Sequence, residues 1–297
     1  MYRVILLATL LALGLQSPAR AAFETLGQST QASAMAGAYA VHAADATALW
    51  YNPAGLAQTG QRQVLLDYAR LFPGLDVGPD INSWSLGYVQ HLAGGTVGLG
   101  LAGLSADFYS ENALALGYGL QVGSRLQVGL GLRFLSWSAD GYRDPSGARD
   151  PDRSGSGLGV DLGLRAPLVR WREGLFSAAF VGQNLNEPDI SEGGGTGIPR
   201  HLVLGLAYDD AVYGLEANMV WVDGDQRLRV GGEYKMGGRY DVRLRLGASG
   251  LAGDGAGGQV DGGLGLKRGS WLLNYAYGYA AEIDADGSQR FSLAYQF

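Results

Sequence analysis

The chain has 297 residues, a net charge of −6 at neutral pH and no cysteine. An acidic chain gains nothing from phosphate backbones, which argues against nucleic-acid binding, and the lack of cysteine excludes disulfides and thiolate metal sites. Forty-nine glycines beside 17% charged and 47% hydrophobic residues are an unusual composition for a soluble enzyme.

Residues 1–21 have the pattern of a secretory signal peptide. About twelve apolar residues follow Arg3, and the Ala19-x-Ala21 spacing favours cleavage after Ala21. A run of that length is too short for a membrane anchor, because the hydrocarbon core is roughly 30 Å thick. Removing residues 1–21 takes away two arginines and no acid, so the net charge changes from −6 to −8.

Residues 22–60 lack strand periodicity and consist largely of small side chains. Asp45 is placed to cap a helical turn through Trp50, and Asn52 to cap another that starts at Pro53. The segment is too weakly apolar to form a core alone. We therefore expect a plug, or hatch, inside a barrel; the alternative is a disordered periplasmic tail.

Residues 61–297 divide into about fourteen segments of alternating apolar and small or polar residues, separated by turn residues. The second face is rich in glycine, which suits a lumen with something inside it; these glycines are Gly98, Gly100, Gly117, Gly119, Gly129, Gly131, Gly159 and Gly163. Backbone pairing in lipid requires closure, and no mature segment is long and apolar enough for a membrane helix. The predicted fold is an all-β transmembrane antiparallel barrel with the hatch in its lumen.

The clearest predicted hairpin spans residues 227–246. A three-residue turn at 237–239 would place Lys235 opposite Asp241, Glu233 opposite Arg243 and Tyr234 opposite Val242. A slip by one residue would put these charges against aliphatic partners on the lipid side, so we expect the register to be well specified.

The connections alternate between long and short along the chain, with long segments at 72–80, 138–156, 185–198, 249–258 and 280–287. In outer-membrane barrels the short turns are periplasmic and the long loops external. Two connections depart from the pattern, 223–226 being short and 167–174 rather long.

The last strand resembles the closing strand of a bacterial outer-membrane barrel, because large apolar side chains alternate up to a terminal aromatic residue. The resemblance implies that the barrel assembly machinery reads it as an insertion signal, carried by Phe291, Leu293, Tyr295 and Phe297.

The amino-terminal segment also resembles a known family. Residues 33–40 and the block 45–56, with its Asn-Pro-Ala-Gly-Leu sequence, are similar to the signature of PorV/PorQ-family outer-membrane proteins, relatives of FadL-type fatty-acid transporters. Ala36 and the pair Ala44-Asp45 depart from the common pattern. The resemblance implies a fourteen-stranded barrel with an internal hatch, and its hatch motif falls on Gly37, Tyr39, Asp45, Asn52, Pro53 and Gly55.

Charged residues gather on the predicted lumen face of neighbouring strands. They form a charge belt of Glu216, Arg227, Arg229, Glu233, Lys235, Asp241, Arg243 and Arg245. Two interpretations stay open: paired charges that stiffen the wall and hold the hatch, or a polar track for a ligand or a protein tail.

Other candidate chemistry is weak. The glycine pattern at 98–103 matches a dinucleotide fingerprint, but that motif needs a following helix and a strand follows here. His42, His91 and His201 lie far apart without acids at ligand spacing. We expect no cofactor, no metal site and no catalytic residue.

The PorV/PorQ resemblance implies a non-enzymatic barrel that binds or shuttles secreted protein cargo. The second hypothesis is a FadL-like channel for hydrophobic small molecules, and an open pore is disfavoured because the hatch fills the bore. The expected location is the outer membrane, with lipid and the barrel assembly machinery as partners.

Overall fold

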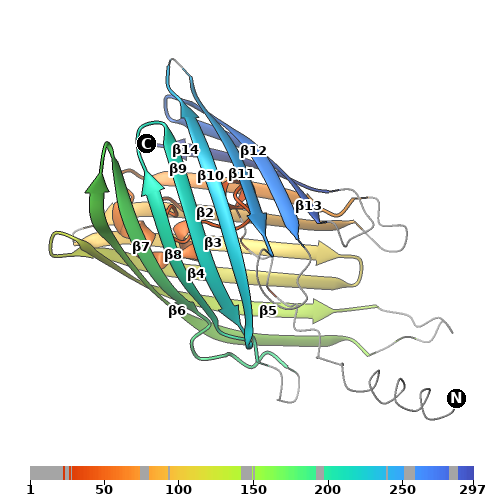
Figure 1. Cartoon of the computed structure of the whole chain (residues 1–297). Helices are drawn as coiled ribbons and strands as arrows, with labels where there is room; N and C mark the ends of the chain where they lie inside the picture. Colours follow the sequence, from red (N-terminus) through yellow and green to blue (C-terminus); the bar gives the residue numbers. More distant parts are fainter. Residues whose placement is uncertain are drawn as a thin grey trace, which may run out of the picture.

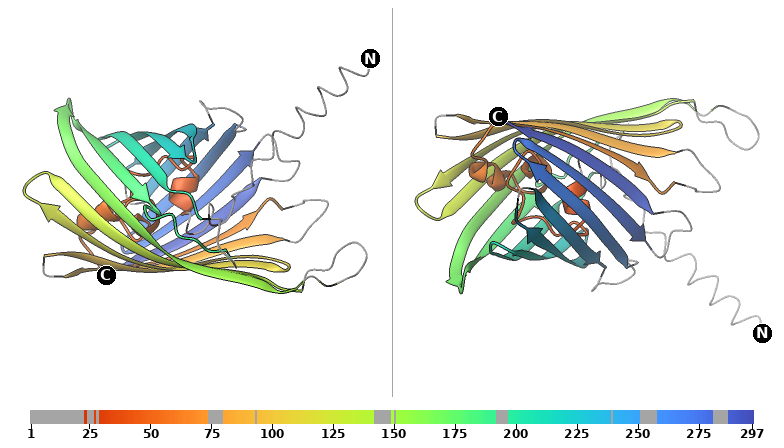
Figure 2. Two further views of the ribbon diagram at one scale, coloured as in Figure 1. Left: turned by 90° about the horizontal axis from the view of Figure 1, so that it is seen from below. Right: turned by 90° about the horizontal axis from the view of Figure 1, so that it is seen from above.

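The computed structural model describes residues 23, 27, 29–73, 80–92, 94–141, 149, 151–191, 197–238, 240–250, 258–280 and 287–297. Each strand pairs antiparallel with its neighbours in sequence, and the first strand pairs with the last, so the sheet closes on itself. The predicted closed antiparallel barrel is confirmed, with the hatch segment enclosed by the strands (Figures 1 and 2). The predicted signal peptide lies outside the described residues.

Three short helical turns precede the barrel: α2 (Thr30–Ser33), α3 (Ala48–Tyr51) and the 3-10 helix η1 (Pro53–Gln58). None of the described helices has the length and apolarity to cross a membrane. The fourteen strands are β1 (Gln63–Leu71), β2 (Ile81–Leu92), β3 (Gly95–Ala106), β4 (Tyr109–Val122), β5 (Leu126–Ala139), β6 (Arg153–Trp171), β7 (Gly174–Gln183), β8 (His201–Asp209), β9 (Tyr213–Val222), β10 (Asp225–Met236), β11 (Asp241–Ser249), β12 (Gln259–Arg268), β13 (Trp271–Ala280) and β14 (Ser288–Gln296).

The two ends of the barrel differ in their connections. At the end where Gln63 pairs with Gln296, the connections after even-numbered strands span two to four residues. The opposite end carries the segments 72–80, 140–152, 184–200, 250–258 and 281–287, together with two-residue turns at 107–108 and 223–224. Since both barrel termini lie at the short-turn end, the strand count is even, as the sequence predicts.

The two faces of the wall follow the period of two seen in the sequence. Along β1, inward residues are buried and outward residues exposed in strict alternation. Large apolar side chains cover the outside; Leu66 is 50% and Leu130 is 50% exposed. Small and polar side chains face the lumen, where the largest apolar cluster forms around hatch residues.

The register of the hairpin between β10 and β11 differs from the prediction by two residues. Glu233 lies opposite Arg245, Tyr234 opposite Leu244 and Lys235 opposite Arg243. The connection is longer than the three residues assumed, because β10 ends at Met236 and β11 begins at Asp241. A shift by two keeps every side chain on its predicted face, so the charges still line the lumen.

The predicted long connection at 167–174 is also wrong. β6 continues through Pro167 to Trp171, with a register shift at Pro167 and Val169, and the turn is Arg172–Glu173. The cause is a β-bulge at Pro167, which has no backbone N–H to donate. Pro167 lies past Arg165, the last residue of β6 that pairs with β5, so β6 pairs only with β7 at this point.

Candidate functional site

The hatch is built from turns that its own side chains stabilise. Ser29 accepts a hydrogen bond from the backbone N–H of Ala32 and caps α2. The Asn52 side chain accepts from the N–H of Ala54 at 3.0 Å, and Pro53 occupies the first turn of η1. Proline suits this position because the first N–H of a helix has no partner inside it.

Asn52 also joins two parts of the hatch. It is 0% exposed, and its Nδ2 donates to the carbonyl of Ala40 at 2.8 Å. Gly55 lets the chain cross itself, since a Cβ there would collide with the carbonyl oxygen of Ala43. Both residues therefore fix the approach of η1 to the segment before α3.

The other residues of the hatch motif lie in the same plug. The Tyr39 hydroxyl donates to Gln31 at 2.8 Å, and the Gln31 amide donates to Asp45 at 3.3 Å. Asp45 also accepts from the N–H of Thr47 at 2.9 Å. Gly37 has a φ of +77°, and a Cβ there would lie 2.9 Å from a guanidinium nitrogen of Arg229, so its conformation and its neighbour both favour glycine.

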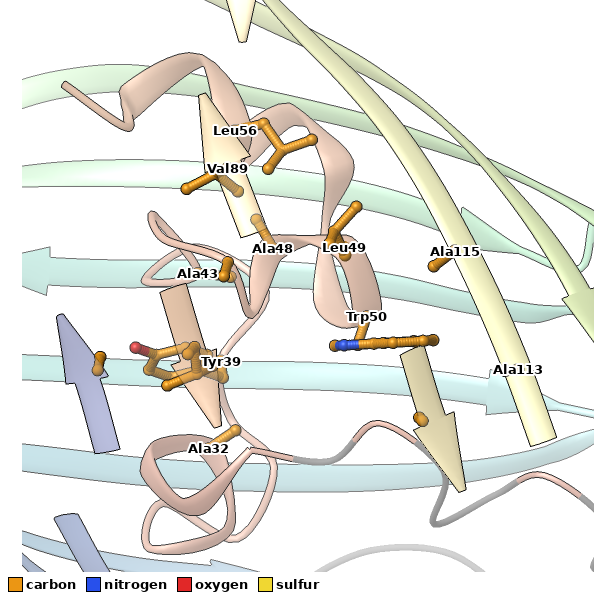
Figure 3. Packing of buried hydrophobic residues seen from close by; sticks show 14 of the residues in the cluster. Ala32, Tyr39, Ala43, Ala48, Leu49, Trp50, Leu56, Val89, Ala113 and Ala115 are labelled. Atoms are coloured by element: carbon orange, nitrogen blue, oxygen red, sulfur yellow. The ribbon is translucent and has the colours of Figure 1, made fainter. Parts of the chain in front are cut away.

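Six of the eight lumen glycines form the seat of the hatch, whereas Gly131 and Gly159 lie against Asp161 and Asn184 of the wall and its connection. A Cβ at Gly98 or Gly117 would lie 2.9 or 2.7 Å from Leu49, and one at Gly119 would lie 2.7 Å from Leu56. At Gly129 and Gly163 a Cβ would overlap the chain around Pro53. The hatch fills the space in front of this wall with Leu49, Trp50 and Leu56 (Figure 3).

Polar wall residues tether the hatch at several points. Asp67 of β1 accepts from the backbone N–H and the hydroxyl of Thr30 at 2.7 and 2.9 Å. Gln183 of β7 donates to the carbonyl of Trp50 at 2.6 Å, and Arg165 of β6 donates to the carbonyl of Val41 at 3.0 Å. The sequence alone does not single out these three wall residues. Each is an isolated polar residue on a lumen face, and this is the only signal that the sequence offers for them.

Glu216 makes the most concentrated tether. Its carboxylate accepts from the N–H groups of Val41 and His42 at 2.8 and 3.0 Å, and lies 2.7 Å from Nδ1 of His42. Nε2 of His42 lies 3.4 Å from Asp209. Burial lowers the pKa of His42, but the nearby carboxylate of Asp209 and the hydrogen bond to Glu216 outweigh burial and raise the pKa to about 9. The imidazolium therefore bridges the hatch to two acids on neighbouring strands at neutral pH.

The charge belt divides into groups. Glu233 pairs with Arg245 at 2.6 Å and with Arg243 at 3.4 Å, and Arg243 pairs with Asp241 at 2.8 Å. Lys235 reaches Asp209 at 2.6 Å.

The remaining members of the belt lie elsewhere on the lumen wall. Glu216 binds the hatch, as described above, and Arg229 lies against Gly37. Nε of Arg227 is buried without a hydrogen-bond partner among the described residues. The predicted belt is therefore a set of separate contacts along the lumen wall, and part of it meets the hatch.

Three residues of the predicted insertion signal lie on the outward face of β14, and Phe297 follows directly after the strand. Phe291 and Phe297 are each 53% exposed. Phe291 packs on Tyr275 with ring centroids 4.9 Å apart, and Tyr295 on Trp271 at 4.6 Å. The strand therefore presents an aromatic row at the seam where the barrel closes against β1.

The segment after β7 folds over the long-connection end of the lumen. The carbonyl of Ile190 accepts a hydrogen bond from Nε1 of Trp137 at 2.9 Å, and Ile190 and Ile198 belong to the same apolar cluster as the hatch. The Arg133 to Asp161 ion pair, at 2.7 Å, also holds Asn184, whose N–H donates to Asp161 at 2.8 Å. The segment after β7 thus covers this end of the lumen beside the apolar cluster of the hatch.

A cavity of about 560 Å³ opens at the long-connection end, between this segment and the turn after β9. Leu202 and Trp221 lie on the outward faces of β8 and β9, whereas Val222 faces the lumen. The cavity therefore connects the outer and inner sides of the wall at the rim of the barrel. Its volume lies within the range of about 300–1,000 Å³ that is usual for ligand pockets. Its lining is Glu187, Asp189, Gly197, Ile198, Pro199, Arg200, Leu202, Trp221, Val222, Asp223 and Gly224.

No protein-family model and no curated protein matches the chain. Several solved structures match this chain over nearly the whole length of both proteins. The monoaromatic hydrocarbon channel CymD has a TM-score of 0.66 at 14% identity, with 93% of this chain and 98% of that one covered. The toluene transporter TbuX of Ralstonia pickettii has a TM-score of 0.64 at 13% identity, with 92% and 99% covered.

A FadL homologue of Pseudomonas aeruginosa has a TM-score of 0.54 at 15% identity, with 91% of this chain and 98% of that one covered. These matches support the predicted relation to FadL-type proteins at the level of the fold. They give no support to the narrower PorV/PorQ assignment. The chain has the fold of FadL-type outer-membrane channels.

Proposed function

We propose that this protein is a non-enzymatic outer-membrane channel for hydrophobic small molecules. The observation that carries the proposal is the hatch. It fills its glycine seat so closely that a single methyl group on Gly129 would overlap the backbone of Pro53. A bore filled in this way is unsuited to free diffusion of hydrophilic solutes, whereas small apolar molecules can pass between apolar side chains that shift.

Two further features support the proposal. Every strand of the closed sheet carries exposed apolar or aromatic side chains on its outer face. Such a surface is suited to contact with lipid and unsuited to contact with water. The rim cavity offers both apolar side chains, such as Trp221, and polar ones at the end where long connections gather. The described relatives in fold are named as hydrocarbon channels and a toluene transporter.

Uptake by cells that express the protein tests the proposal. We expect toluene to enter several times faster than into cells without the protein, while entry of a hydrophilic sugar stays unchanged. No increase for toluene would contradict the proposal. An equal increase for both compounds would indicate an open pore instead.

Protein secretion is the second candidate function, and only the sequence signature at 33–40 and 45–56 favours it. The comparisons support the channel better than this role. A tagged protein recovered from its native membrane would separate the two: secreted proteins bound in stoichiometric amount would favour secretion. Interaction with the barrel assembly machinery through Phe291, Leu293, Tyr295 and Phe297 is part of either proposal.

A further inference from the structure

A second, smaller cavity lies between the hatch and the wall. It has a volume of about 100 Å³ and is lined by Ser33 of α2 and by residues from β1, β12, β13 and β14. It sits toward the long-connection end, because β1 ends there and β12 and β14 begin there. A molecule that moved past the hatch on this side would meet it.

The lining contains polar groups that lack partners. Asp261 is 3% exposed; its Oδ1 accepts from Gln259 at 2.8 Å, while its Oδ2 has no hydrogen-bond partner among the described residues. The hydroxyl oxygen of Ser33 is likewise buried without one. A buried carboxylate oxygen without a donor costs free energy, so a group that donates a hydrogen bond here is stabilised.

The lining offers both a hydrogen-bond acceptor and a hydrogen-bond donor. Asp261 contributes one acid and Arg290, 5% exposed, one base. A carboxylate ligand has no proton to donate to Asp261 and an ammonium ligand has no acceptor for Arg290, whereas a neutral hydroxyl can donate to the first and accept from the second. Leu71, Phe72 and Ala276 supply apolar lining beside these groups.

We propose that this cavity binds the hydroxyl group of neutral hydroxylated small molecules, such as phenols and alcohols, on the path of the channel proposed above. The inference rests on that function and narrows its substrate class. The cavity holds the polar head, and the hydrocarbon part of the molecule extends along the apolar lining. A phenol stays neutral at physiological pH because its pKa is about 10.

Equilibrium dialysis of the purified full chain in detergent tests the proposal, with protein-free micelles as the blank. The probes are 4-methylphenol, toluene and 4-methylbenzoate, which share a ring and differ in the polar group. We expect 4-methylphenol to bind at least tenfold more tightly than the other two. Asp261→Asn should weaken 4-methylphenol about tenfold and leave toluene unchanged.

Asp241→Asn is the matched control, since it removes the same charge from the lumen face of β11 outside this cavity. It should leave all three affinities unchanged. Ser33→Ala, which alters the hatch side of the cavity, replaces Asp261→Asn if that variant does not fold. Equal binding of 4-methylphenol and toluene, or an unchanged affinity in both variants, would mean that the cavity holds only water and would overturn the inference.

The two proposals fail in different ways. If cells take up toluene and 4-methylphenol equally and neither variant changes the ratio, the channel function stands and the hydroxyl site is refuted. If 4-methylphenol binds as expected while expression increases uptake of neither compound, the site stands and the channel function is refuted.

Discussion

Asn52 shows how one side chain stabilises the hatch. It satisfies the carbonyl of Ala40 and the N–H of Ala54 while being fully buried. Both Ala40 and Ala54 are buried as well. Asparagine suits this position for a physical reason: its side-chain nitrogen donates and its oxygen accepts, so one short side chain satisfies both groups.

We expect Asn52→Ala to destabilise the hatch by about 1–3 kcal/mol for each buried group left without a partner. The barrel itself should persist, because its strand pairs do not involve this residue. Limited proteolysis of the purified protein measures the effect: cleavage within 29–60 should accelerate while the barrel fragment survives. Asn52→Asp, which keeps the acceptor for Ala54 but buries a carboxylate against the carbonyl of Ala40, should show at least as large an acceleration. Equal cleavage of all three proteins would contradict this account.

His42 makes the hatch sensitive to pH. Its folded-state pKa of about 9 lies above the usual value of 6.5, so the folded state binds the proton more tightly than the unfolded state. The resulting stabilisation is complete below pH 6.5 and is lost as the pH rises through about 9, on the order of 3 kcal/mol in total. Proteolysis of the hatch should therefore accelerate between pH 7 and 10.

The control for this prediction is His42→Gln, which retains a polar side chain without a titrating proton. Its hatch should be less protected at pH 7 and should show little further change up to pH 10. A wild-type protein whose hatch is equally protected at pH 7 and 10 would show that the contacts with Glu216 and Asp209 do not stabilise it.

At the scale of elements, the close fit between the glycine wall and η1 keeps the hatch seated in the lumen. Gly129→Ala places a methyl group against the backbone of Pro53 and Ala54, which cannot move as a flexible side chain can. We expect overpacking to destabilise the seated hatch by about 1–3 kcal/mol and to increase the entry of small hydrophilic solutes into proteoliposomes.

Gly60→Ala is the matched control, because no atom lies within 4 Å of the added methyl group. It should behave as the wild type in the same swelling assay. If Gly129→Ala is also indistinguishable from the wild type, the seat is looser than the structure indicates.

The elements also show which features the sequence could predict. The faces of β10 and β11 follow from the period of two, which survives any shift by an even number of residues. The register depended on the turn at 237–240, whose length the alternation does not determine, and so the partners of Lys235 and Glu233 were assigned incorrectly. In the same way, Pro167 suggested a loop, but a β-bulge accommodates it within β6.

The candidate site was less predictable than the fold. The hatch motif was found because it is one continuous segment with recognisable turn residues. Its tethers Asp67, Arg165 and Gln183 come from three strands, and only closure of the barrel brings them to one plug. The cavities depend on the same closure, so no local pattern could indicate them.

At the scale of the whole molecule, the outer face of the wall should not tolerate a charged side chain, because it contacts lipid. Leu130 lies on the outer face and is 50% exposed. We expect Leu130→Arg to destabilise the barrel by about 2–4 kcal/mol near the middle of a bilayer, measured as a lower urea midpoint in lipid vesicles. Without detergent or lipid, the protein should not stay dissolved in water. If Leu130→Arg is as stable in vesicles as the wild type, the outer face does not contact the bilayer.

A disulfide between the hatch and the wall tests the central claim most directly. The Cβ atom of Ala46 lies 2.9 Å from the position that a Cβ would take at Gly87 of β2, and a disulfide needs about 3.5–4.5 Å between these atoms, so a small movement suffices. In the otherwise cysteine-free chain, Ala46→Cys with Gly87→Cys should form an intramolecular bond in nearly all molecules, detected by mass spectrometry of the proteolysed protein. Ala46→Cys with Leu86→Cys, on the opposite face of β2, should form none; if neither pair forms a bond in the folded barrel, the hatch does not occupy the lumen.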